Sequence, residues 1–167
     1  MTFAECAVLD EWPTSATTTR PPAGMDYSSV ASSVFGANTA PHWLTSAHSR
    51  IARLMNLQAN WNTYGARPIQ FHVATAAFDL LCQIADSKTP SPAIVPTSDG
   101  KLQIEWHQGG FDLEVRVDSR SSFSFSFEDA YSDAAPIEDE PLKYDFTPLR
   151  KAVDKLSQRL NEGALRG

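Results

Sequence analysis

The chain has 167 residues, 42% of them hydrophobic and 20% charged, a size and composition suited to one globular domain with its own core. It contains no apolar run near the roughly 18 to 20 residues of a membrane-spanning helix, and its opening residues lack the basic start of a secretory signal, so we expect a cytoplasmic protein that does not enter a membrane. A formal net charge of −6 excludes a basic surface that neutralises phosphates, and we expect no direct nucleic-acid binding.

Residues 1–40 are rich in serine, threonine, alanine and proline and contain few large apolar side chains. Such a segment buries too little surface to offset the entropy lost on ordering. We therefore predict a mobile tail that precedes a single domain of residues 41–163. An alternative for the first part of the tail is a short docking element, because it carries Phe3, Leu9 and Trp12.

Two helices are predicted next. Apolar residues from Leu44 to Met55 recur at spacings of three and four, which is typical of an amphipathic helix over residues 42–59. Residues 70–87 are apolar around nearly the whole helical circumference, which indicates the most buried helix. The prolines of the following KTPSP end this second helix.

The stretch NWNTYGARP, residues 60–68, joins the two predicted helices. Glycine suits a position that needs positive φ, and the two asparagines can bond the local backbone. The aromatic side chains are predicted to wedge the corner against a sheet, with the tryptophan buried beside a second tryptophan. The residues predicted to build this corner are Trp61, Tyr64, Gly65 and Trp106.

From residue 93 the apolar period changes from that of a helix to that of a strand. Three turn-like segments, SDG, QGG and SRS, separate four strand-like segments, AIVPT, KLQIEWH, FDLEVRVD and SFSFSFE. We therefore predict a four-stranded antiparallel meander. Alternation places one face in the core and the other in water. The water-facing residues are predicted to be Gln103, Glu105, His107, Asp112, Glu114, Arg116, Asp118, Ser122, Ser124 and Ser126.

Residues 128–145 hold seven acidic residues and one lysine, and the other 13 acids and 13 bases cancel, so this segment carries the whole net charge. Pro136 and Pro141 indicate irregular chain, and we predict an acidic connection here. Apolar residues from Leu149 to Leu160 then predict a final helix. The predicted fold is α+β with two layers, in which helices pack on one face of the meander in the order α-α-β-β-β-β-α.

The water-facing side of the sheet carries the weak candidates for catalysis, Glu105, His107 and Asp112. Glu105 and His107 could act together as base and orienting group, with Asp112 across the hairpin. We prefer the interpretation of a solvated sheet face and predict no catalytic residue. The carboxylates of this face could also collect a divalent cation, but Arg116 stands among them, and we predict no metal and no other cofactor.

The acidic connection is predicted to contact a basic surface of a partner protein, because charge complementarity directs such encounters. The residues expected to do so are Asp129, Asp133, Glu138, Asp139 and Glu140. Two alternatives stay open, a mimic of nucleic acid that competes for a basic cleft and a loop that only solubilises the protein. The oligomeric state is also open, because an edge strand can pair with another chain.

The sequence resembles a family of small uncharacterised bacterial proteins. These pair a corner like N-W-D-G-Y-G-A with a strand like P-x-x-D-G-x-x-x-E-W, and here NWNTYGARP and PTSDGKLQIEW match the two patterns within residues 51–118. The resemblance implies a bacterial or phage setting, with defence or toxin–antitoxin neighbourhoods, and no established activity. Asn62 and Thr63 stand where similar sequences often have Asp and Gly, so any catalysis by that Asp would be lost here.

The function that these observations favour is that of a non-enzymatic cytoplasmic interaction or regulatory protein, with a defence, anti-defence or antitoxin-like role as one version. It would bind a basic partner surface through its acidic residues. The alternative is a small hydrolase or nuclease that uses Glu105, His107 and Asp112.

Overall fold

The computed structural model describes residues 40–164 of the chain, so the predicted tail lies outside the described residues except for Ala40. The described elements are α2 (His42–Met55), α3 (Phe71–Ile84), β1 (Ala93–Pro96), β2 (Leu102–Gln108), β3 (Phe111–Val117), β4 (Phe123–Asp129), β5 (Ile137–Leu142) and α4 (Thr147–Ala164). The α+β class is confirmed. None of these three helices is long and apolar enough to span a bilayer.

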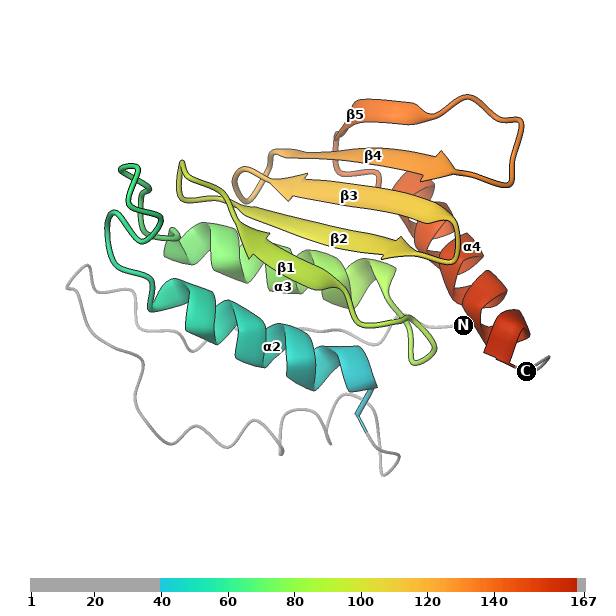
Figure 1. Cartoon of the computed structure of the whole chain (residues 1–167), viewed down its shortest axis with the longest axis horizontal. Helices are drawn as coiled ribbons and strands as arrows, with labels where there is room; N and C mark the ends of the chain where they lie inside the picture. Colours follow the sequence, from blue (N-terminus) through green and yellow to red (C-terminus); the bar gives the residue numbers. More distant parts are fainter. Residues whose placement is uncertain (1–39, 165–167) are drawn as a thin grey trace. The chain divides into compact units, whose positions relative to one another are not determined.

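The sheet is antiparallel throughout, and its spatial order β1-β2-β3-β4-β5 is the order of the chain (Figure 1). The prediction of four strands was wrong by one strand, because β5 forms inside the acidic segment that we expected to be irregular. Five of its six residues are exposed, so it shows no apolar alternation. Backbone pairing with β4 forms it instead, and an edge strand tolerates Pro141.

One face of the sheet is covered by helices and forms the core with them. Figure 1 shows α2 and α3 on the same side of the sheet; α2 packs against β1 and α3, while α3 packs against β2, β3 and α4. Three alanines of α3, Ala74, Ala76 and Ala77, are buried, and small side chains let the helix approach its neighbours closely. The sheet contributes Leu102, Ile104, Trp106, Phe111, Leu113, Val115, Val117, Phe123 and Phe125 to this core.

The corner after α2 is closed by its asparagines, as the sequence predicts. The Oδ1 of Asn60 accepts a hydrogen bond from the backbone N–H of Gly65 at 2.7 Å. The Oδ1 of Asn62 accepts from the N–H groups of Tyr64 and Ala66 at 2.9 and 3.1 Å. Gly65 has a φ of 82°, which confirms the need for positive φ.

The corner meets the turn between β1 and β2 through backbone groups and through the amide of Asn62, which donates to the hydroxyl of Ser98 at 3.2 Å. Tyr64 is 91% exposed, and the half-buried Trp61 donates from Nε1 to the carbonyl of Arg67 within the corner at 3.2 Å. Trp106 is buried elsewhere, where its Nε1 donates to the carbonyl of Pro90 at 2.9 Å. The wedge prediction was therefore wrong for Tyr64, because the asparagine hydrogen bonds already hold the corner without its ring.

The two patterns that carry the family resemblance contact each other in space. The N–H of Arg67 donates to the carbonyl of Ser98 at 2.9 Å, and the N–H of Gln70 donates to that of Gly100 at 3.2 Å. A Cβ at Gly100 would lie 2.6 Å from the carbonyl oxygen of Pro68. The glycine of the turn between β1 and β2 is thus what lets the corner pack against that turn.

Replacing Gly65 by valine is expected to lower the free energy of unfolding by about 1 to 2 kcal/mol, the cost of left-handed backbone in an L-residue. Apart from its chain neighbours, no residue has an atom within 4 Å of the place that a Cβ would take at Gly65, so the loss comes from backbone strain and not from a clash. Gly65→Asn is the control, because asparagine tolerates this conformation. Urea unfolding measures both variants, and equal stabilities would contradict the explanation.

Candidate functional site

The second face of the sheet carries polar side chains and is turned away from α2 and α3, which Figure 1 shows on the other side of the sheet. We call it the open face and define it by the alternation and register of the strands. It consists of Gln103, Glu105 and His107 of β2, Asp112, Glu114 and Arg116 of β3, and Ser124, Ser126 and Glu128 of β4.

Two pairs of carboxylates stand directly opposite each other on the open face. Glu105 of β2 faces Glu114 of β3, and Asp112 of β3 faces Glu128 of β4. Like charges in directly opposed positions destabilise a sheet. These two pairs lie next to each other along the strands, and both run against the preference of sheets for opposite charges in opposed positions. Local departures of this kind are concentrated at functional sites.

The structure brings together all three weak catalytic candidates. The Nε2 of His107 lies 3.3 Å from Oε2 of Glu105, and its Nδ1 lies 2.9 Å from Oδ1 of Asp112. Partial burial of the ring lowers the pKa of His107, but the hydrogen bond with Glu105 and the charges of Asp112, Glu105 and Glu114 outweigh it, so the pKa is raised. The side chain of His107 is 46% exposed, and this cluster is open to water.

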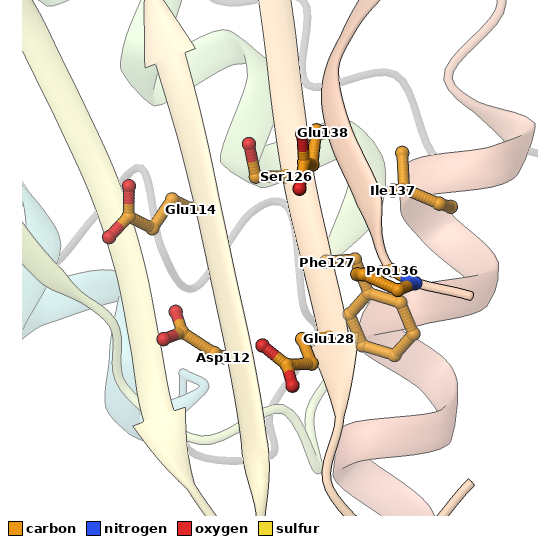
Figure 2. A pocket seen from close by; sticks show the side chains of 8 residues that line it. All are labelled: Asp112, Glu114, Ser126, Phe127, Glu128, Pro136, Ile137 and Glu138. Atoms are coloured by element: carbon orange, nitrogen blue, oxygen red, sulfur yellow. The ribbon is translucent and has the colours of Figure 1, made fainter. Parts of the chain in front are cut away.

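Beside this cluster lies a shallow hollow of about 240 Å³ at the junction of β3, β4 and β5. Figure 2 shows four carboxylate side chains around it, those of Asp112, Glu114, Glu128 and Glu138. The side chains that complete its lining are Ser126, Phe127, Pro136 and Ile137. We call this feature the acidic hollow.

The acidic residues that were expected to contact a partner do not share one surface. Glu138 lines the acidic hollow, and Asp133 is exposed in the turn before β5. Asp139 accepts a hydrogen bond from the hydroxyl of Ser124 at 2.6 Å. Glu140 of the edge strand β5 pairs with Phe125, whose side chain points into the core. The side chain of Glu140 therefore lies on the core side of the sheet, at its exposed edge, and not on the open face.

Asp129 departs most from its expected position, because its carboxylate is buried, with a side chain only 4% exposed. Arg159 of α4 holds both carboxylate oxygens, at 2.6 and 2.9 Å, and Lys155 lies 2.6 Å from Oδ2. The guanidinium of Arg159 also lies over the ring of Phe111, 4.0 Å from its centre. Asp129 thus anchors α4 to the end of the sheet and is removed from the set of partner-binding residues.

Comparisons of the chain with known protein families, with curated proteins and with solved structures give no match.

Sequence reasoning selected Glu138 as a partner-binding residue, but it did not select Glu128 and did not predict the acidic hollow. Glu128 was placed both at the end of the predicted strand SFSFSFE and in the acidic connection, and the structure puts it in β4 on the open face. The signal for the His107 cluster, which the sequence did bring together, is the two-residue turn between β2 and β3. Its register pairs Glu105 with Glu114 and His107 with Asp112.

Proposed function

We propose that this chain is a non-enzymatic cytoplasmic interaction protein that binds a basic surface of a partner protein through its open face. The observation that carries the proposal is the two pairs of opposed carboxylates, Glu105 with Glu114 and Asp112 with Glu128. A cationic group of a partner that binds between these carboxylates would relieve their mutual repulsion in the free protein. A bacterial or phage setting, with a defence-related role, belongs to the proposal through the family resemblance alone.

The dimensions of the acidic hollow favour a single side chain as its occupant. Its volume of about 240 Å³ is below the range of roughly 300 to 1,000 Å³ that drug-sized ligands occupy. Four carboxylates around a space of this size suit one guanidinium or ammonium group. Arginine fits better than lysine, because its planar fork can bond two carboxylate oxygens at once.

Charge complementarity of this kind acts mainly on the rate and selectivity of association. Exposed charges are screened within about 8 to 10 Å at physiological salt, so binding should weaken as salt rises.

The double variant Glu128→Gln and Glu138→Gln is expected to reduce capture of the partner at least tenfold, because each substitution removes a charge from the acidic hollow. The immobilised full chain would be exposed to a lysate of its source organism at low and physiological salt, and captured proteins quantified by mass spectrometry. The matched control is Asp154→Asn with Glu162→Gln, two exposed acids of α4 that change the net charge equally.

A partner retained by the control and lost by the hollow variant supports the proposal. Equal capture by both variants would contradict it and leave the acidic residues a solubilising role. Added duplex DNA or RNA that displaces the captured protein would identify the partner's basic surface as a nucleic-acid cleft, which is the mimic version of the proposal.

A small hydrolase or nuclease is the second candidate, favoured by the contact of His107 with both Glu105 and Asp112. Such a histidine can take up a proton from an attacking water while one carboxylate orients the ring. Hydrolysis of an activated phosphodiester by the wild-type chain, abolished in His107→Ala, would establish this candidate. Equal rates in the two proteins would exclude it.

A further inference from the structure

Three metal-ligating groups of the open face converge on one point. The Nε2 of His107 lies 3.3 Å from Oε2 of Glu105 and 4.0 Å from Oε1 of Glu114. One ligand atom from each of the three residues lies within 4.8 Å of the other two. In a tetrahedral zinc site with bonds of about 2.0 to 2.2 Å, ligand atoms stand roughly 3.3 to 3.6 Å apart. Small side-chain rotations therefore suffice to bring the three onto one ion.

Two of the three groups are oriented by a neighbouring residue. The Oδ1 of Asp112 lies 2.9 Å from Nδ1 of His107, which leaves Nε2 as the nitrogen that faces the two glutamates. The amide of Gln103 donates to Oε2 of Glu114 at 2.7 Å, which turns Oε1 toward the imidazole. A carboxylate behind the histidine and a hydrogen-bonded carboxylate ligand are the usual outer contacts of protein metal sites.

The arginine of the open face is engaged elsewhere. Arg116 stands among the acids in the sequence, but its guanidinium lies 3.7 Å from Asp118, which Lys101 also contacts at 2.9 Å. Among the ion pairs of residues 40–164, none joins Glu105 or Glu114 to a lysine or an arginine. Within these residues, the imidazole of His107 is therefore the only fixed counter-charge beside the two opposed glutamates.

We propose that Glu105, His107 and Glu114 form a binding site for a divalent transition metal, with zinc as the ion that best fits one imidazole and two carboxylates. Asp112 and Gln103 act as positioning residues. Oxygen-only ions such as Mg²⁺ and Ca²⁺ are disfavoured by the nitrogen ligand. The exposure of the open face leaves the fourth zinc position to water or to a group of a bound molecule.

The site goes beyond the proposed interaction and is tested through different residues, because neither Glu128 nor Glu138 is a ligand. Zinc chloride would be titrated calorimetrically into the full chain and into His107→Gln, Asp112→Asn and the control His72→Gln, whose histidine is exposed on α3. We expect one site in the wild type and the control. The affinity should fall about 10- to 100-fold in Asp112→Asn, the usual effect of losing an outer contact. A larger loss is expected in His107→Gln.

Ring-nitrogen NMR of the full chain supplies a readout that does not depend on total zinc uptake. Zinc should shift the Nε2 signal of His107, identified by its absence in His107→Gln, and leave that of His72 in place. Melting temperatures in EDTA establish that all variants fold. Equal zinc affinity of wild type and His107→Gln, absence of zinc binding by the wild type, or an unshifted His107 signal at saturating zinc would each overturn the site.

Discussion

Replacing Trp106 by alanine is expected to lower the free energy of unfolding by about 3 to 5 kcal/mol, the range for large aromatic truncations in a core. The side chain is 1% exposed, so the truncation leaves a cavity that its neighbours on β2 and β3 cannot fill without moving. It also removes the indole donor that bonds the carbonyl of Pro90 at 2.9 Å, and the loss of this part-buried hydrogen bond adds to the destabilisation. Urea unfolding measures the change.

Tyr64→Ala is the control for Trp106, because that ring is 91% exposed, and it should change the free energy of unfolding by no more than about 0.5 kcal/mol. Trp61→Ala should fall between the two, since its indole is half-buried and donates a hydrogen bond to the carbonyl of Arg67 within the corner. A loss below about 1 kcal/mol for Trp106→Ala would mean that this part of the core is not closely packed.

Asp129→Asn is expected to lower the free energy of unfolding by about 2 to 3 kcal/mol, within the range for hydrogen bonds to charged groups that are lost from a buried position. The substitution removes the charge that holds Arg159 and Lys155 against the end of the sheet. Asp133→Asn is the matched control, an exposed aspartate four residues away. Equal stability of the two variants would contradict the anchoring role.

The stabilisation by Asp129 should depend on pH in a defined direction. The hydrogen bond from Arg159 is the main cause that holds the pKa of this carboxyl far below its usual value. Burial acts in the opposite direction, and Lys155 and the N–H of Tyr131 lower the pKa further. The folded state therefore releases the proton more readily than the unfolded state, whose aspartate titrates near pH 3.9. The contribution is complete above that pH and is lost as the pH falls below it. Consequently the stability difference between wild type and Asp129→Asn should shrink in acid.

Much of the fold could be predicted because its signals are local. The helix and strand periods, the turns and the asparagine bonds of the corner arise between residues close in sequence. β5 could not be predicted in this way, because its residues are nearly all exposed and its only reason to be extended is the unpaired edge of β4. The burial of Asp129 depends on α4, which follows in the chain and docks through Lys155 and Arg159.

The cluster around His107 was within reach of sequence reasoning, since strand alternation and one tight turn place Glu105 and Asp112 beside it. The acidic hollow was not, because it requires Glu138 from a strand that the sequence does not signal. The positions of Arg116 and Gln103 were also out of reach. Each of these long side chains could have turned toward either end of its strand. Only the structure shows that Arg116 contacts Asp118 and that Gln103 contacts Glu114.

The sequential order of the strands bears on how quickly the sheet can assemble. Each strand pairs only with its neighbours along the chain, so every pairing closes a short loop and gives up little chain entropy. Such local topology is associated with fast folding among small domains. The contacts between α4 and the end of β4 span a longer stretch of chain, as between Asp129 and Arg159. We therefore expect the meander to form early in refolding and the docking of α4 to follow, which makes mutations in α4 act mainly on the unfolding rate.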